Sequence, residues 1–290
     1  MANMRWKKYR VLVSNKCNYR CPFCHNEGQK MQAKSDLMLF EDFKQLVDLL
    51  VTEDTEELNI SGGEPFVNKS IVDVIEYADS QLSCDISCAT NLSLLNLEQI
   101  DRLARTRIKL NIQFPYADEN NFRKSTGNGS LSDVLQKVRL VRDANIKIGL
   151  NTVIQNDNAA AYEQLIMFAL ENELPLKLLP QIGGKNSDRY KDFIIPVLDK
   201  YSIEVKDKGC GALRWVLENN RHRTTVLYID SPCFYHDIET CRNFAEIRIH
   251  PDMTAQTCIL KDDTVKLCFE KGNTYVKQQL QELWNDFTTC

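Results

Sequence analysis

The chain has no long apolar run and no excess of positive charge. No stretch of its 290 residues approaches the length of apolar sequence that crosses a bilayer, and the basic residues 1–10 are not followed by the apolar segment of a signal peptide. Lysine and arginine total 36 against 40 aspartate and glutamate, so the formal net charge is −4. No basic stripe stands out, which disfavours binding to bulk nucleic acid. These absences predict a cytoplasmic protein without a membrane or nucleic-acid partner.

Glycine and proline are also sparse, at 11 and 8 residues. No low-complexity tract, fixed-period repeat or long flexible linker is present, and 43% of the residues are hydrophobic. A chain of this length and composition can bury a substantial core. It is therefore long enough for one large domain, or for one domain with an extension.

Cysteine, by contrast, is abundant, with 11 residues. In a reducing compartment such residues are unlikely to form a disulfide framework. Clustered cysteines in a cytoplasmic protein are better interpreted as metal ligands or catalytic groups.

Short strand-like runs alternate with helical stretches over the first two thirds of the chain. This rhythm predicts a parallel sheet with helices packed outside it, closed by right-handed crossovers into a complete or partial barrel. In such a barrel the chemistry lies at the C-terminal ends of the strands. The expected strands are 9–14, 57–60, 84–89, 108–114, 146–154 and 176–180, and the expected helices are 40–50, 69–79, 97–104, 131–143 and 159–171.

The alternation of strand-like and helical segments ends at residues 183–187, and the remainder of the chain does not follow it. Strand-like pieces are expected at 225–229, 245–250 and 254–260. A final amphipathic helix places Val276, Leu280, Leu283, Trp284 and Phe287 on one face. The predicted fold class is α/β, a partial (β/α)6 TIM-like barrel over residues 1–195 with a smaller C-terminal α+β extension over 196–290.

Cys17, Cys21 and Cys24 lie within one short loop after the first expected strand. Thiolates this close can converge on one soft metal centre. A structural zinc site closes with four ligands, and simple iron–sulfur clusters also take four cysteines. Three thiolates on a cubane would leave one iron open to another molecule. The alternatives are a zinc site with His25 as the fourth ligand, or a redox or merely buried group of thiols.

The CxxxCxxC spacing in this position resembles the radical S-adenosylmethionine (SAM) superfamily. The resemblance implies a 4Fe–4S cluster whose open iron is chelated by the methionine moiety of SAM. An electron from the reduced cluster would then split SAM into methionine and a 5′-deoxyadenosyl radical. Phe23 fits the aromatic residue that commonly precedes the third cysteine of the family near the adenine, although ordinary packing would also explain it.

Further segments are similar to the same family at successive strand ends. Ser61-Gly62-Gly63-Glu64-Pro65 resembles the GGEP motif that receives the amino group of SAM, and its glycines allow a close approach of the backbone. Polar residues at three later strands match positions that contact SAM in the family, although such residues also cap helices or bind water. The cofactor-binding residues expected from the resemblance are Phe23, Gly62, Gly63, Glu64, Pro65, Asn91, Gln113 and Asn151.

Two stretches resemble the GTP 3′,8-cyclase branch of molybdenum-cofactor biosynthesis. One is residues 24–28, which continue past the third cysteine, and the other is residues 122–131, a loop before the fourth helix of that branch. The branch binds a second 4Fe–4S cluster through three C-terminal cysteines. The resemblance implies Cys233, Cys241 and Cys258 as ligands of a second cluster here, although buried cysteines also serve as small hydrophobic residues.

Cys210 or Cys268 could supply a fourth ligand, as in auxiliary-cluster domains of peptide-modifying relatives. The C-terminal third also departs from the cyclase pattern. An expected Arg-x-Arg reads Glu246-Ile247-Arg248, which replaces a cation by an anion and should weaken the binding of a triphosphate. Gly149 stands where the branch carries a lysine for the carboxylate of SAM, and the terminal Gly-Gly is absent. These departures argue against cyclisation of GTP.

The sequence therefore predicts a radical SAM enzyme that abstracts hydrogen from a small-molecule substrate, with a nucleotide-like substrate included. The alternatives are a peptide-modifying enzyme with an auxiliary cluster and a non-enzymatic iron–sulfur or zinc protein. The first expected strand begins almost at once, so no leader-peptide-binding domain is expected before it, which favours the small molecule. An electron donor such as flavodoxin or ferredoxin is the expected partner. Candidate residues at the barrel mouth are Gln113, Tyr116, Lys147, Gln181 and Arg248.

Overall fold

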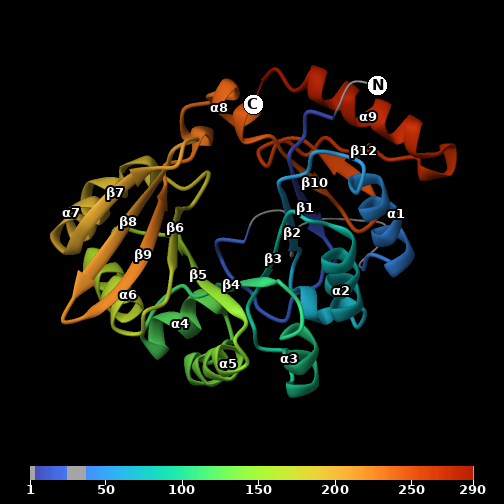
Figure 1. Cartoon of the computed structure of the whole chain (residues 1–290). Coiled ribbons are helices and arrows are strands. Elements are labelled where there is room, and N and C mark those ends of the chain that lie inside the picture. Colours follow the sequence, from blue (N-terminus) through green and yellow to red (C-terminus); the bar gives the residue numbers. More distant parts are fainter. Residues whose placement is uncertain (1–3, 25–36, 290) are drawn as a thin grey trace.

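The computed structural model describes residues 4–24 and 37–289. Six parallel strands follow one another in chain order across the middle of the sheet, as the alternating pattern predicts. Figure 1 shows them curling into an open barrel. These strands are β1 (Lys8–Leu12), β2 (Glu57–Ser61), β3 (Asp85–Thr90), β4 (Lys109–Gln113), β5 (Lys147–Ile154) and β6 (Leu176–Pro180).

Helices cover the outer face of this barrel (Figure 1). Each helix turns an apolar stripe toward the sheet, so that residues such as Phe43, Ile75 and Leu165 are fully buried against the outward-facing residues of the strands. The helices are α1 (Phe40–Leu50), α2 (Ile71–Gln81), α3 (Leu97–Leu103), α4 (Glu119–Thr126), α5 (Leu131–Asp143), α6 (Ala159–Glu171) and α7 (Lys191–Tyr201).

The last third of the chain extends both edges of the same sheet. Strand β10 (Glu246–Ile249) pairs in parallel with β1, and β9 (His222–Ile229) pairs in parallel with β6. The remaining elements are β7 (Ser202–Asp207), β8 (Ala212–Asn219), α8 (Ile238–Phe244), β11 (Thr254–Gln256), β12 (Val265–Lys266) and α9 (Asn273–Asp286). Among the described residues the strands form one 12-stranded sheet in the order β12-β11-β10-β1-β2-β3-β4-β5-β6-β9-β8-β7.

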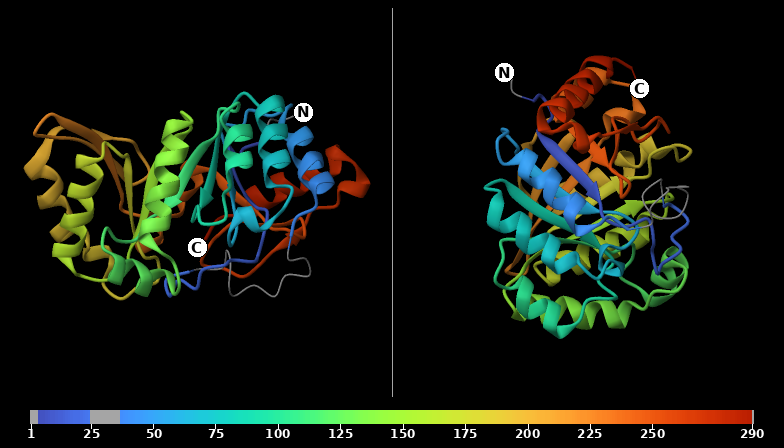
Figure 2. Two further views of the ribbon diagram at one scale, coloured as in Figure 1. Left: turned by 90° about the horizontal axis from the view of Figure 1, so that it is seen from below. Right: turned by 90° about the vertical axis from the view of Figure 1, so that its right-hand side faces the viewer.

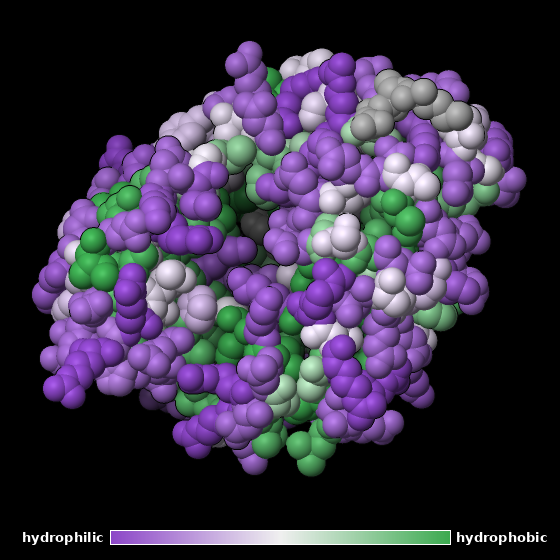
Figure 3. All heavy atoms as spheres, in the orientation of Figure 1, coloured by the Kyte–Doolittle hydropathy of each residue, from purple (hydrophilic) through white to green (hydrophobic). Residues whose placement is uncertain are grey.

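Two arms thus project from the barrel, one with β7–β9 and one with β10–β12 (Figure 1). The predicted division at residue 195 lies inside helix α7, and strand pairing is continuous from the barrel into both arms. A separate C-terminal domain stays a prediction. The space-filling view has its deepest hollow near the middle, where the ribbon view places the ring of strands (Figure 3).

Helix α9 closes one end of the molecule over the first residues of the chain. The Trp6 ring meets Trp284 edge to face with centroids 4.8 Å apart, and its Nε1–H donates to the Leu280 carbonyl at 2.8 Å. Burial of both indoles adds apolar contact area between helix α9 and the residues that precede β1. The predicted amphipathic helix is confirmed here, with Val276, Leu280 and Trp284 buried.

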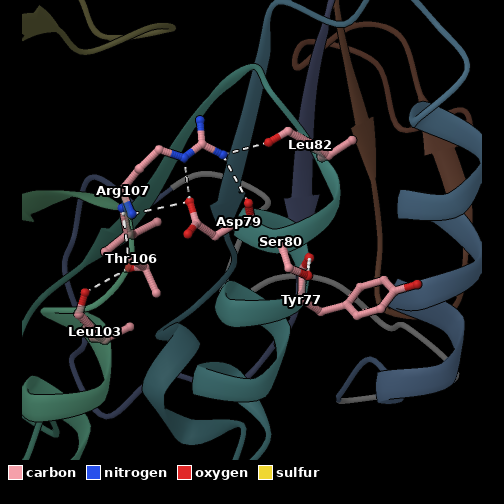
Figure 4. A network of polar contacts seen from close by, with 8 residues as sticks. Tyr77, Asp79, Ser80, Leu82, Leu103, Thr106 and Arg107 are labelled. Atoms are coloured by element: carbon pink, nitrogen blue, oxygen red, sulfur yellow. Dashed lines mark hydrogen bonds and ion pairs between the residues drawn. The ribbon is translucent and has the colours of Figure 1, made fainter.

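Arg107 connects the turn before β4 to the end of α2 through hydrogen bonds and an ion pair (Figure 4). Its guanidinium donates to the carbonyls of Asp79 and Leu82 at 3.1 and 2.6 Å, and it pairs with the Asp79 carboxylate at 2.9 Å. The last carbonyls of a helix have no partner within the helix, so a cation there satisfies them and offsets the helix dipole. The contact fixes the spacing of two neighbouring β/α units.

No helix in the described part of the chain is long and apolar enough to cross a membrane.

Candidate active site

A cavity of about 280 Å³ opens at the C-terminal ends of the barrel strands. The loop after β1, which carries three cysteines, forms one wall, and the inward side chains of several strands form the floor. Its lining consists of Arg10, Cys17, Tyr19, Cys21, Phe23, Cys24, Ser61, Gly62, Gly63, Ala89, Thr90, Asn91, Asn111, Gln113, Asn151, Val153, Arg248 and Ile259. Most of the residues expected from the sequence therefore meet in one place.

Cys17, Cys21 and Cys24 all line this cavity and are each partly exposed. Burial, followed by the charges of Cys17 and Cys24, raises the pKa of the Cys21 thiol to about 12. Burial also raises the pKa of the Cys17 thiol. Neighbouring thiols of which at least Cys17 and Cys21 resist ionisation on their own are suited to a cationic centre that would stabilise the thiolates.

No group of three or more His, Cys, Asp or Glu side chains within residues 4–24 and 37–289 lies close enough to hold a single metal ion. The sulfurs thus line one cavity without meeting at a point. A cubane cluster is larger than a single ion and keeps its thiolates further apart. The donor set, three soft thiols in one partly closed cavity, fits such a cluster better than a zinc ion. His25, the alternative zinc ligand, lies outside the described residues.

Gly62 and Gly63 hold the cysteine loop in place. A Cβ on Gly62 would come within 2.3 Å of the Ser14 carbonyl oxygen, and one on Gly63 within 2.3 Å of the Lys16 oxygen. The Gly63 N–H donates to the Ser14 carbonyl at 2.7 Å, and the next amide, that of Glu64, donates to the Lys16 carbonyl at 2.8 Å. Because backbone lies against backbone here, only glycine fits at these positions. The absence of side chains therefore serves the cysteine loop as well as any bound cofactor.

Glu64 is fully buried beneath this loop and joins the ends of β2 and β3. Its carboxylate accepts hydrogen bonds from the Thr90 hydroxyl at 2.7 Å, the Asn91 amide at 2.7 Å and the Phe66 amide at 3.1 Å. Burial raises its pKa, while these hydrogen bonds act in the opposite direction. Glu64 and Pro65 do not line the cavity, so the part of the GGEP segment that faces it is the glycine pair.

Asn91 links the end of β3 to the first cysteine. Its side-chain amide donates to the Asn18 side-chain oxygen at 2.8 Å and lies 3.9 Å from the Cys17 sulfur. Ser93 in turn donates to Asn91 and accepts from Asn18, at 2.7 Å in each case. This cyclic arrangement fixes the orientation of Asn91 at the cavity wall.

The segment between α4 and α5 supports the other side of the cysteine loop. The Arg20 amide donates to the Thr126 carbonyl at 2.9 Å, and the Asn128 side chain donates to the Asn18 carbonyl at 3.0 Å. A Cβ on Gly129 would meet the Tyr19 ring at 2.8 Å. The blue cysteine loop runs beside green α4 along the lower edge of the left view in Figure 2. Residues 122–131, noted for their family resemblance, thus serve as a docking site for the loop.

Polar side chains from adjacent strands form the floor of the cavity. Asn111 and Gln113 alternate along β4, and Asn151 is the register partner of Gln113 on β5. The Gln113 side-chain nitrogen is buried with no hydrogen-bond partner among the described residues. A buried donor without a partner costs free energy, so its presence at a cavity wall favours a bound acceptor.

The remaining sequence candidates are distributed as follows. Phe23 is buried at the cavity wall, and Gln113 and Arg248 line the floor. Tyr116 lies outside the lining and contacts the Tyr162 hydroxyl at 3.2 Å. Lys147 begins β5, at the end of the strand opposite the cavity, and Gln181 follows β6 outside the lining.

The C-terminal cysteines lie outside the cavity lining. Cys233 follows β9, Cys241 lies in α8, and Cys258, which is buried, follows β11 next to the lining residue Ile259. The described residues do not bring three of them together as a metal site. Cys210 occupies the turn between β7 and β8, and Cys268 lies beside α9, where Gln279 contacts its sulfur at 4.0 Å. The second cluster stays a prediction.

Arg10 and Asn111 are lining residues that the sequence interpretation did not select. Both lie on strands at positions that alternate with buried apolar residues, as in the pattern Tyr9-Arg10-Val11. In a barrel the apolar residues face the helices, so a charged or amide side chain between them must face the interior. The alternation of apolar and polar residues along each strand was the signal that could have identified Arg10 and Asn111.

A second depression, of about 400 Å³, lies between α1 and the segment from β12 to α9. Its walls include Asp42, Asp48, Lys266 and Glu270, and no cysteine lines it. Nothing in its lining resembles a catalytic arrangement.

Comparison with known proteins identifies the family. Residues 11–169, more than half of the chain, match the model of the radical SAM superfamily. A GTP 3′,8-cyclase of Clostridium perfringens (strain 13 / Type A) is 23% identical over 286 residues, which cover 94% of this chain and 87% of the relative. A probable GTP 3′,8-cyclase of Thermoplasma volcanium is 22% identical over 265 residues, covering 88% and 80%.

Solved structures show the same fold. SuiB of Streptococcus suis bound to S-adenosylmethionine superposes with a TM-score of 0.71 at 13% identity, over 97% of this chain and 66% of that chain. This chain thus spans slightly less than two thirds of the SuiB chain. The protein anSMEcpe with bound AdoMet gives a TM-score of 0.66 at 12% identity, over 96% and 82%. The chain therefore belongs to the radical SAM superfamily, a family of enzymes that use a 4Fe–4S cluster and SAM.

Proposed function

We propose that this enzyme reductively cleaves SAM and uses the resulting radical to abstract hydrogen from a small-molecule substrate. The observation that supports the proposal best is the meeting of Cys17, Cys21 and Cys24 with Gly62, Gly63 and Asn91 around one cavity. The floor of the same cavity carries the polar side chains of Asn111, Gln113 and Asn151, which do not belong to the cysteine loop and which a substrate beside SAM would contact.

The residues of the chain would divide the work as follows. Cys17, Cys21 and Cys24 would hold the cluster, and its open iron would take the methionine moiety of SAM. The Gly62–Gly63 backbone and Asn91 would position SAM, and Phe23 would pack near its adenine. When bound, the cluster and SAM supply a 5′-deoxyadenosyl radical, which is chemistry that no side chain of the protein provides.

Gln113 and Asn151 would orient SAM or the substrate at the floor of the cavity. Carboxamides both donate and accept hydrogen bonds without ionising, so they can fix a polar molecule in one pose at any pH near neutrality. The buried walls around them would keep water away from a reactive carbon radical. Flavodoxin or ferredoxin is the proposed electron donor.

A small molecule related to nucleotides is the first substrate class, because GTP 3′,8-cyclases are similar to this chain over most of its length. A peptide is the second candidate. It is favoured by the likeness to SuiB, one structure of which is described as bound to precursor peptide SuiA, with a TM-score of 0.70 over 97% of this chain.

A second 4Fe–4S cluster on Cys233, Cys241 and Cys258 is part of the proposal. Two of these cysteines follow strands that extend the barrel, and Cys258 precedes a cavity-lining residue. The cluster would therefore lie toward the substrate side of the cavity. Cys210 and Cys268 lie on different arms, so at most one of them would complete its ligand set.

The direct test is SAM turnover by protein reconstituted with iron and sulfide under anaerobic conditions. With dithionite as reductant, the enzyme should convert SAM to methionine and 5′-deoxyadenosine, measured by liquid chromatography and mass spectrometry. Full cluster loading without SAM cleavage under several reductants would instead favour an iron–sulfur or zinc protein without this activity.

The matched control compares two alanine variants. Cys17→Ala should lose both turnover and the iron of one cluster, because it removes a proposed ligand. Cys88→Ala, at a cysteine buried in strand β3 on the helix side, should retain iron and turnover, since Cys88 belongs to the apolar core.

A further inference from the structure

An ion triad forms the wall of the cavity where the second arm joins the barrel. Strands β1 and β10 run in parallel, with Arg10 opposite Arg248 in register. Glu246, two residues before Arg248, accepts two hydrogen bonds from the Arg10 guanidinium at 3.1 and 3.2 Å. The Arg248 guanidinium lies 3.3 Å from the same carboxylate. One glutamate thus lies between two arginines.

The triad is nearly enclosed. The side chains of Glu246 and Arg248 are 11% and 13% exposed, and that of Arg10 is 25% exposed. Both arginines line the cavity, whereas Glu246 does not, so the carboxylate lies behind the two guanidiniums as seen from the cavity. A bidentate arginine–carboxylate pair is geometrically fixed, which holds both guanidiniums in place before any ligand arrives.

Other charges near the triad come from neighbouring strands. Lys177 on β6 is partly buried and interacts with Glu57, Lys109, Arg10 and Glu246. Within the triad itself, two guanidiniums contact one carboxylate, which leaves an excess of one positive charge. Lys8, at the start of β1, also contributes to lowering the pKa of Glu246, and its ammonium group lies over the Phe244 ring at 3.9 Å.

The remaining floor adds hydrogen bonds and no charge. Asn111, Gln113 and Asn151 are carboxamides on two adjacent strands, and the Gln113 side-chain nitrogen is a buried donor without a partner in the described structure. A bound molecule would therefore meet polar neutral groups along most of the floor and the two guanidiniums at one end. Such a surface matches a polar molecule with one anionic end.

We propose that Glu246 sets the substrate charge of this enzyme, so that Arg10 and Arg248 accept one carboxylate or another singly charged anion and reject polyphosphates. This inference rests on the proposed function for the identity of the cavity as the substrate site. Two guanidiniums without Glu246 would attract a polyanion strongly. With it, a second or third negative charge of a ligand meets a fixed carboxylate in a site of low dielectric, where like charges repel at close range.

The test measures anion binding to the reconstituted enzyme in the presence and absence of SAM, by isothermal titration calorimetry. The probes are tripolyphosphate, N-acetylglycine as a monocarboxylate, and N-acetylglycinamide as its neutral counterpart. Wild-type protein should bind N-acetylglycine more tightly than the amide and should bind tripolyphosphate weakly. Glu246→Gln should tighten the binding of tripolyphosphate by about tenfold or more, because it releases two guanidiniums from a charged partner.

Glu246→Asp is the matched control, since it keeps the charge and should bind tripolyphosphate as weakly as wild type. Equal tripolyphosphate affinity in wild type and Glu246→Gln would overturn the proposal. Competition between SAM and N-acetylglycine would also overturn it, because the arginines would then hold the carboxylate of SAM. If Glu246→Gln does not fold, Arg248→Gln decides the matter, and unchanged N-acetylglycine binding in that variant contradicts the proposal.

The binding experiment and the SAM turnover experiment test the two proposals separately. Absence of 5′-deoxyadenosine in the wild-type reaction would refute the proposed function and would leave the charge preference of the cavity measured. Normal SAM cleavage together with strong tripolyphosphate binding by wild type would refute only the charge preference.

Discussion

At the scale of single residues, the site depends on groups whose role is to hold other groups. Gly62 and Gly63 allow the cysteine loop to lie directly on the backbone after β2, and Glu64 anchors the next loop from below. The GGEP pattern could be recognised from the sequence, but its contacts with residues 14–16 could not. Those contacts depend on the packing of two loops that are distant in the chain.

Gly63→Ala should therefore displace the cysteine loop. The new Cβ would lie 2.3 Å from the Lys16 oxygen, and backbone atoms cannot move aside cheaply, so we expect a loss of about 1–3 kcal/mol in stability and reduced iron loading. Gly149→Ala is the control, because its Cβ would make ordinary van der Waals contacts with the flexible end of Lys109 at 3.4 Å and the Pro175 carbonyl oxygen at 3.7 Å. Iron per chain after reconstitution distinguishes them, and equal loading of both variants would contradict this role of Gly63.

Glu246 should contribute stability that depends on pH. Burial opposes its ionisation, but Arg10 and Arg248 outweigh burial and lower its pKa from 4.5 to about 2. A carboxyl group whose pKa is lower in the folded than in the unfolded protein stabilises the fold fully at pH values above its unfolded pKa. For Glu246 this contribution is lost as the pH falls from 4.5 to about 2.

In metal-free protein, Glu246→Gln should cost roughly 3 kcal/mol at pH 7 and almost nothing near the low end of that range. Denaturant unfolding of wild type and variant, followed by circular dichroism at several pH values, measures the loss of unfolding free energy at each pH. Asp101→Asn, at an exposed pair with Arg105, should change stability little. A Glu246→Gln deficit that does not vary with pH would show that the ion triad is not its source.

At the scale of elements, the alternating pattern predicted the six barrel strands and most of the helices that cover them. The period-two and helical signals are strong there because each element buries one face. The sequence did not predict α4, α7, α8, β7, β8 or β12. Helix α4 is short and polar, with Ser125 and Thr126 among its few buried residues, and α7 contains Pro196. Strand β7 is largely exposed, so it lacks the alternation of a half-buried strand.

Glu64 joins two elements, and its replacement should loosen both strand ends. In Glu64→Gln one carboxylate oxygen becomes an amide nitrogen, which would face the donor of Thr90 or Asn91. A buried polar mismatch costs about 1–3 kcal/mol, so the thermal midpoint should fall by several degrees. Glu41→Gln, at a side chain that is 74% exposed, should leave the midpoint unchanged. Equal midpoints of the two variants would contradict the linking role of Glu64.

At the scale of the whole molecule, the last third of the chain is built onto both edges of the barrel sheet. The sequence predicted strands at β9, β10 and β11 but could not place them on the barrel. The register partners of β9 and β10, on β6 and β1, lie 50 and 238 residues away, and β11 joins the sheet through β10. This placement brings Arg248 and Ile259 to the cavity. The C-terminal part of the chain thus contributes directly to the site.

Iron content tests the proposed division of labour between the two ends of the chain. About eight iron atoms per chain would correspond to two cubane clusters and about four to one. Replacing Cys233, Cys241 and Cys258 together by alanine should remove one cluster and leave the other. Iron that is unchanged in this triple variant would show that these cysteines are not cluster ligands.

The central claim is that three thiolates leave one iron of the first cluster open to SAM. Electron paramagnetic resonance of the reduced cluster tests it most directly, in the variant that lacks Cys233, Cys241 and Cys258. Addition of SAM should change the spectrum, and ¹⁵N in the SAM amino group should give a hyperfine coupling to the cluster. A reduced cluster whose spectrum is unaffected by saturating SAM, or one that persists when Cys17, Cys21 and Cys24 are all replaced, would contradict the account.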